Sequence, residues 1–271
     1  MELFNSLVTA LFDALLYPLN FIGASWSVFL VSIIAGIALL VIYGKVSNQQ
    51  AIKKVKKNIA AGIYESVLFR NDLRVSLKAQ AKMFLGGLKY FGLAIPPILI
   101  LMIPCLLILA QLNLRYGVRP LDIGESTIVS VQVSDDSALF SAELKAPEGT
   151  IATPPLRDLD TLTVSWRVDA KSKVTDKAII QVGDQSVEQE ILVATSKSKI
   201  PTEISTSPLW QFLYPGAEIP TQAKNLIKGI TISYPEKTLT LFGLTSNWIV
   251  IFLVVSILAG IVGSKFLKVE I

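Results

Sequence analysis

Three long apolar segments constrain this chain more than any other feature. A helix that crosses a hydrocarbon core of about 30 Å needs roughly 20 predominantly apolar residues. Residues 23–44, 93–113 and 247–265 each provide such a stretch. Overall, 52% of the residues are apolar and only 17% are charged, whereas an ordinary soluble domain carries about 25% charged residues. The sequence therefore predicts a membrane protein with three transmembrane helices.

Tryptophan side chains near the span ends are candidate membrane-interface anchors, because amphipathic rings favour the headgroup layer. Trp26 and Trp248 lie near the starts of the first and third spans. Trp210 belongs to an aromatic-rich segment, residues 207–215. That segment predicts either a short helix resting on the membrane surface or a closure at one end of the external domain.

Residues 1–22 do not resemble a secretory signal, which begins with a positive region, since no Lys or Arg precedes Lys45. Apolar residues recur instead at helical spacing from Leu3 to Leu16, and polar residues such as Thr9 and Asp13 fill the other face. This pattern is typical of an amphipathic helix lying in the interface plane. The alternative is a helix that packs on a partner subunit.

The distribution of charge predicts the orientation of the spans, because short cytoplasmic loops carry an excess of Lys and Arg. Residues 45–89 hold ten basic and two acidic groups, a net charge of +8. Residues 113–246 hold 13 basic and 16 acidic groups, a net charge of −3. We therefore expect residues 45–92 and the tail 266–271 in the cytoplasm of a cell with an inner membrane. The N-terminus and residues 114–246 are then expected outside.

Residues 45–92 predict a basic helical hairpin. Apolar residues repeat at spacings of three and four from Ile52 to Val67, and again from Leu73 to Leu88. These stripes are expected to seal the pair of helices or to meet a partner. The basic side chains are candidate contacts for nascent chains, ribosomes or lipid, or they simply enforce the topology. These side chains are Lys53, Lys54, Lys56, Lys57, Arg70, Arg74, Lys78 and Lys82.

Residues 114–246 show the period-two alternation of strands and predict an antiparallel β-sandwich of six or seven short strands. Residues 178–182 and 186–193 flank Gly183 and predict one hairpin, and residues 230–234 and 238–242 predict a second that leads into the third span. Trp166 has the alternating context of an inward-facing core residue.

The chain carries few residues suited to catalysis. It has no His and one Cys, Cys105, which excludes His-dependent triads, His-ligated metals and intramolecular disulfides. Ser196 and Lys199 have the spacing of a Ser–Lys hydrolase, but that chemistry needs a desolvated lysine and this one lies in a polar stretch. We expect no enzymatic activity, no cofactor, no metal site and no DNA binding. The paired acidic residues Asp135–Asp136 and Asp158/Asp160 are interpreted as turn residues.

Proline and polar residues mark the second span. Pro96, Pro97 and Pro104 each remove a helical hydrogen bond and predict a bend that would permit a groove or a hinge. Gln111 and Arg115 follow at its outer end, where an arginine can reach the interface.

The order of these elements resembles the YidC/Oxa superfamily of membrane-protein insertases, particularly its small three-span members. The most similar segment runs from Leu85-Gly86-Gly87 to Ile95-Pro96-Pro97 and Pro104. It looks like the approach to that family's second conserved span. Two features depart from the family. Residues 24–44 and 93–112 hold no basic residue, and a β domain of some 120 residues stands where the family has a short connection.

Two functions follow as hypotheses. The resemblance implies a factor that inserts or assembles membrane proteins, with clients or ribosomes at the hairpin. The alternative is a non-catalytic subunit of a larger membrane complex that docks a partner through its β domain. A polar groove within the membrane favours the first hypothesis, and a dry helix bundle with an apolar patch on the β domain favours the second.

Overall fold

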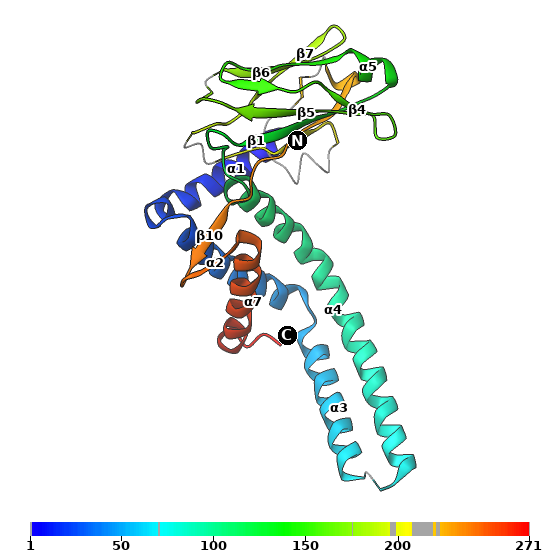
Figure 1. The fold of residues 1–271 in the computed structure, drawn as a ribbon. Coiled ribbons are helices and arrows are strands. Elements are labelled where there is room, and N and C mark those ends of the chain that lie inside the picture. The colour runs from blue at the N-terminus through cyan, green and yellow to red at the C-terminus, as the bar shows by residue number, and fades with distance from the viewer. Residues whose placement is uncertain are drawn as a thin grey trace. The chain divides into compact units, whose positions relative to one another are not determined.

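A computed structural model describes residues 2–69, 71–174, 176–195, 199–207, 219–220 and 223–270 (Figure 1). The chain divides into two compact units. The first combines Met1–Ser27 with Leu109–Ile249, and the second combines Val28–Ile108 with Val250–Ile271. The first unit holds the β domain, and the second holds most of the apolar helices.

Among the described residues, three helices are long and apolar enough to cross a membrane. They are α2 (Ala24–Val46), α4 (Leu73–Tyr116) and α7 (Trp248–Leu267). Their positions agree with the three segments predicted from the sequence. α3 (Gln49–Leu68) lies between the first two and is too polar to be counted with them.

In the second unit, α2 and α7 pack side by side and run in the same direction. A Cβ atom on Gly36 would lie 2.4 Å from the carbonyl oxygen of Ser256, so the absence of a side chain there lets the two backbones meet. Farther along, Gly44 in α2 faces Val269 just beyond α7. Because the contacts advance along both helices together, the two helices share one direction.

α3 and the first half of α4 lie side by side (Figure 1), and we call this pair of helices the hairpin. Gly62 faces Met83 and Gly86 faces Ile59, so the two helices run antiparallel. The Asn48 side chain caps α3 by accepting from the Ala51 N–H at 3.0 Å. The Asp72 carboxylate caps α4 in the same way.

The packing face of the second helix differs from the prediction. Ala79 is fully buried, whereas Leu73, Leu77, Phe84 and Leu88 are exposed. Small residues let the two backbones approach more closely than leucine and phenylalanine would, so Ala79 and Gly86 take the inner positions. The leucine and phenylalanine stripe therefore does not seal the hairpin.

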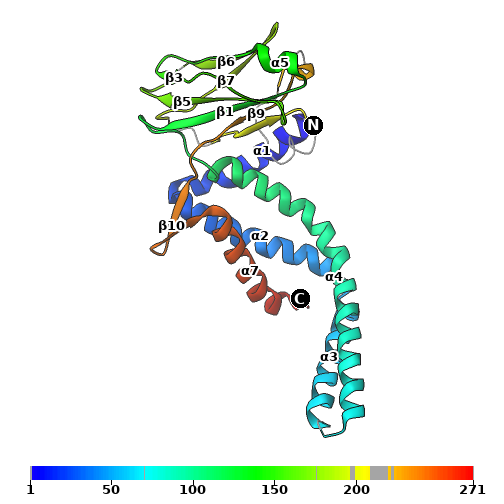
Figure 2. The same ribbon diagram turned by 45° about the vertical axis from the view of Figure 1, so that its right-hand side comes forward.

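α4 continues through all three prolines without a break. Figure 2 shows that its axis changes direction along its length. A proline in a helix interior loses one backbone hydrogen bond and clashes with the preceding turn. The assignment of the bend to these prolines stays a prediction.

The β domain of the first unit consists of antiparallel sheets. The larger sheet has the strand order β3-β5-β1-β9-β8, with β4 also paired to β5, and the smaller has the order β2-β6-β7. The strands are β1 (Ser126–Val133), β2 (Ala142–Lys145), β3 (Thr150–Ala152), β4 (Leu156–Asp158), β5 (Thr163–Ala170), β6 (Lys177–Val182), β7 (Gln185–Glu190), β8 (Glu203–Ser205) and β9 (Ile227–Ile232). Two short helices, α5 (Asp136–Ser141) and η2 (Ala223–Asn225), join them.

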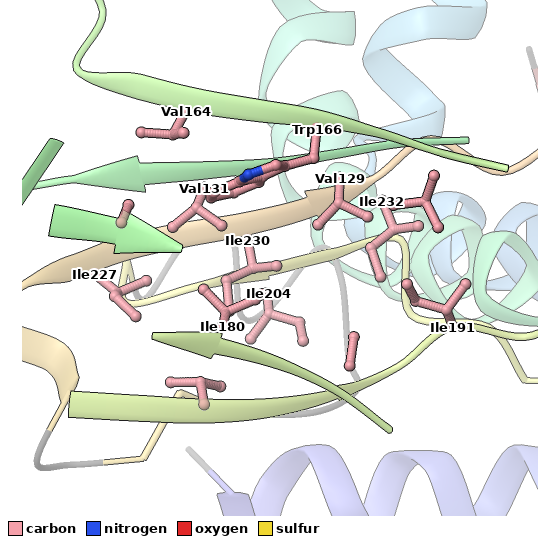
Figure 3. Packing of buried hydrophobic residues seen from close by; sticks show 14 of the residues in the cluster. Val129, Val131, Val164, Trp166, Ile180, Ile191, Ile204, Ile227, Ile230 and Ile232 are labelled. Carbon is pink, nitrogen blue, oxygen red and sulfur yellow. The ribbon is translucent and has the colours of Figure 1, made fainter. Parts of the chain in front are cut away.

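Side chains from both sheets meet in one core, as Figure 3 shows. β1 buries Val129, Val131 and Val133, and β5 buries Val164, Trp166 and Val168, as the alternation predicts. Trp166 is 3% exposed, which confirms its interpretation as a core residue. Ile180 of β6 packs into the same core from the smaller sheet.

One predicted hairpin is confirmed and the other is wrong. β6 and β7 pair across Gly183. By contrast, β9 pairs with β1 and β8, and the strand after it, β10 (Thr238–Leu241), pairs with β11 (Leu244–Asn247). The turn lies at Gly243, whose φ of +81° is one that glycine adopts without strain. Pro235 therefore marks a connection between sheets and not a hairpin turn.

The N-terminal segment folds as α1 (Glu2–Leu16) followed by the short helix η1 (Tyr17–Ile22). Leu7, Leu11 and Leu15 are exposed along one face of α1. Thr9 and Asp13 on the other face contact α4 within the same unit. The polar face of this amphipathic helix is thus held by the protein, and the apolar face is uncovered.

Candidate functional site

The hairpin brings together most of the basic side chains singled out from the sequence. Lys53, Lys54, Lys56 and Lys57 are exposed on α3, and Arg74, Lys78 and Lys82 are exposed on α4. Lys82 forms an ion pair with Glu65 at 2.9 Å, and Lys56 pairs with Glu270 at 3.1 Å. Arg70 lies outside the described residues. Exposed ion pairs of this kind contribute about 0–1 kcal/mol, so these two pairs hold their lysines only weakly.

The α4 half of the hairpin presents three separate faces. Ala79, Met83 and Gly86 face α3, and Arg74, Lys78 and Lys82 form a basic face. A third face is apolar and uncovered, and we call it the apolar stripe: Leu73, Leu77, Phe84, Leu88 and Phe91. Phe84 in the stripe is 70% exposed. An apolar face beside a basic face suits a chain segment that is itself apolar and near anionic groups.

The candidate interface anchors have different environments. Trp26 is 42% exposed, and its ring meets that of Phe242 edge-on with the centroids 5.4 Å apart. Trp248 is only 2% exposed, so its ring packs within the protein. Trp210 and the rest of 208–215 lie outside the described residues.

The first unit contains a cluster of charged side chains that the sequence analysis does not predict. The Arg115 side chain is 7% exposed, and its Nη2 donates to Asp13 Oδ1 at 2.6 Å. Its Nη1 donates to Gln111 Oε1 at 2.6 Å, and Gln111 in turn donates to Thr9 Oγ1 at 3.2 Å. The end of α4 is therefore tied to the polar face of α1, and Arg115 is directed into the protein.

The second oxygen of Asp13 accepts from the Lys199 ammonium. Partial burial by itself would raise the pKa of Asp13, but hydrogen bonds and charges from Lys199 and Arg115 outweigh that effect and lower it. Asp13 is thus held as a carboxylate between two cations. Along the chain, Asp13 is 102 residues from Arg115 and 186 residues from Lys199.

A cavity of about 340 Å³ opens beside this cluster, wholly within the first unit. Arg115, Lys199 and Lys237 line it together with one carboxylate, Asp13. The Lys237 ammonium lies 5.6 Å from the centroid of the Tyr116 ring, also in the lining. Among the described residues that line it, the cavity thus has two more positive charges than negative ones.

Of the two residues with the spacing of a Ser–Lys hydrolase, the structure describes Lys199, which forms an ion pair with the Asp13 carboxylate. Ser196 lies outside the described residues. Searching the described part of the chain finds no cluster of side chains suited to hold a metal. Asp135 caps α5 through the Ala138 N–H at 2.8 Å, and Asp158 accepts from the Asp160 N–H at 3.0 Å, as turn residues do.

The buried serines of α2 are satisfied by backbone carbonyls nearby in the sequence. Ser32 Oγ donates to the carbonyl of Val28 at 2.6 Å, and Ser27 Oγ donates to the carbonyl of Leu19 at 2.8 Å. Among the described residues, every buried side-chain nitrogen or oxygen has a partner. These serines therefore need no water-filled groove to satisfy them.

An apolar patch also lies on the β domain. Phe140 lies in α5, Leu156 is the first residue of β4, and Leu159 directly follows that strand; all three are exposed. Arg157 joins the two elements, since its Nε donates to the Leu139 carbonyl at 2.9 Å. Isolated exposed apolar residues are ordinary, but a group of large ones on joined elements is typical of a contact surface.

No protein-family model, curated protein or solved structure matches the chain.

Proposed function

We propose that the protein is a three-span membrane protein of the YidC/Oxa type that assists the insertion or assembly of other membrane proteins. In this proposal α2, α4 and α7 cross the membrane, the two sheets form an external β-sandwich, and the hairpin projects into the cytoplasm. Parallel packing of α2 and α7 supports this arrangement, because both helices then cross in the same sense. The charge difference between residues 45–89 and 113–246 supports the same orientation.

The observation that carries the proposal is the apolar stripe on the hairpin. Water-exposed leucine and phenylalanine on a helix are unfavourable, because covering one such side chain is worth about 1.5–3 kcal/mol. α3 leaves the stripe uncovered and packs on the adjacent small-residue face. An emerging transmembrane segment has the matching apolar chemistry, and the neighbouring lysines favour an anionic ribosome or lipid surface.

Site-specific photocrosslinking tests the proposal. A photoreactive phenylalanine analogue at Phe84 should capture nascent membrane proteins of varied sequence on stalled ribosomes. The same analogue at Lys78, which is exposed on the basic face of the same helix, should capture far fewer nascent chains. Equal capture at both positions, or no nascent chain at Phe84, would contradict a role of the stripe in receiving clients.

The alternative is a non-catalytic subunit of a larger membrane complex, with the β domain as its docking module. The patch of Phe140, Leu156 and Leu159 favours it, and so do the α2 serines that are satisfied by nearby backbone carbonyls. A photoreactive group at Phe140 should then give one product of fixed size, identified as a single stoichiometric partner. No such product would remove the specific support for this alternative.

A further inference from the structure

The cavity beside Asp13 has a charge imbalance that the described residues do not resolve. Lys199 and Arg115 share one carboxylate. Lys237 has no ion pair within the described part of the chain, and its ammonium lies 5.6 Å from the centroid of the Tyr116 ring. Burial lowers the pKa of Lys237, because removing an ammonium from water without a counter-ion is unfavourable.

The uncharged part of the lining fits the region where a membrane helix leaves the lipid. Ala24 is the first residue of α2, and Tyr116 is the last residue of α4. Leu16 and Tyr17 complete the wall at the junction of α1 and η1. If α2 and α4 cross a bilayer, the cavity lies at the level of the headgroups, where phospholipid phosphates are found.

We propose that this cavity binds a phosphate group, with Lys237 and Lys199 as its direct cationic contacts and Arg115 as the fixed charge behind them. Two sources share that chemistry: the headgroup of an anionic phospholipid and free phosphate. Phosphate fits because it accepts several charge-assisted hydrogen bonds at once and offsets both surplus charges. The lipid source rests on the proposed function, because it requires α2 and α4 to cross the membrane. The hairpin takes no part in the site, so a failed binding test does not bear on the hairpin's proposed role.

The test uses the full-length protein in neutral detergent, titrated with phosphatidylglycerol, phosphatidylcholine or inorganic phosphate. Binding to the folded state stabilises it by RT ln(1 + [L]/Kd), so the midpoint of thermal unfolding rises with ligand concentration. Phosphatidylglycerol should give a concentration-dependent rise, and phosphatidylcholine, whose own cation neutralises its phosphate, a smaller one. If inorganic phosphate competes at millimolar concentration, free phosphate is the ligand; if it does not, the lipid is. No anion-dependent rise with either anionic probe overturns the proposal.

Three variants locate the site. Lys237→Gln should weaken the apparent affinity for the effective anion about tenfold, the loss expected for one charge-assisted contact. Lys228→Gln removes the same charge from an exposed position on β9 and should leave the affinity unchanged. Asp13→Asn removes the competing carboxylate and should tighten binding, a gain that damage to the fold does not produce. Equal effects of Lys237→Gln and Lys228→Gln would place the binding elsewhere and overturn the assignment.

Discussion

At the scale of single residues, the Arg119–Glu125 pair shows how local geometry sets a titration. Arg119 Nη2 donates to Glu125 Oε1 at 2.7 Å, and its Nη1 donates to Oε2 at 2.9 Å. The backbone N–H of Asp122 also donates to Glu125 Oε2 at 2.9 Å. These contacts favour the ionised carboxylate and lower the pKa of Glu125 to about 2 from its usual 4.5.

This pair predicts a specific acid dependence of stability. Because the folded-state pKa of Glu125 is lowered, its contribution is complete above about pH 4.5 and is lost as the pH falls towards about 2. In Glu125→Gln, the free energy of unfolding should fall less steeply over that interval, measured by denaturant unfolding in detergent. Glu148→Gln, at an exposed position without an ion pair among the described residues, serves as control and should follow the wild type.

The charged cluster shows what residue-level reading of a sequence misses. Arg115 was expected to extend towards the interface, and Lys199 was expected to be solvated. The structure brings both to Asp13. Helical periodicity placed Asp13 on the polar face of its helix, but no local pattern relates that face to an arginine 102 residues away. The sequence held one further indication of this contact: an arginine at the end of a membrane span is costly unless it has a partner.

At the scale of elements, helix positions and the alternation of β1 and β5 could be predicted, because one periodicity decides each of them. It was harder to predict which helix faces pack together and which strands pair. Val67 lies in the apolar stripe of α3, and Leu73 lies in that of α4. These stripes are as apolar as the faces that pack together, so composition does not show which face packs. Small residues at Ala79 and Gly86 decide it by allowing close approach. In the same way, Pro235 looked like a hairpin turn, yet β9 pairs with strands distant in sequence.

Two adjacent glycines test the packing of the hairpin. A Cβ atom on Gly86 would lie 2.8 Å from Ile59 Cγ1, whereas one on Gly87 would meet nothing within 4 Å. Gly86→Val should therefore force α3 and α4 apart at a cost of about 1–3 kcal/mol. Amide hydrogen exchange across α3 should become faster in this variant. Gly87→Val carries the same helix-propensity change and should leave the exchange rates as they are; matching rates in the two variants would contradict this packing.

At the scale of the whole molecule, the proposed function requires the hairpin and the β domain to lie on opposite sides of a membrane. Three helices of sufficient length and apolarity alternate with a strongly basic segment and a slightly acidic one. In the proposed topology all three helices cross, and an odd number of crossings puts the two termini on opposite sides. A hairpin that receives new membrane proteins has to lie on the side where proteins are made.

Cysteine labelling in intact cells tests this arrangement most directly. The native Cys105 is replaced by alanine, and single cysteines are introduced at Lys57 in α3 and at Asp160 after β4, both exposed. A membrane-impermeant maleimide should label the cysteine at 160 in intact cells and the cysteine at 57 only after the membrane is opened. Labelling of position 57 in intact cells would place the hairpin outside and contradict the account.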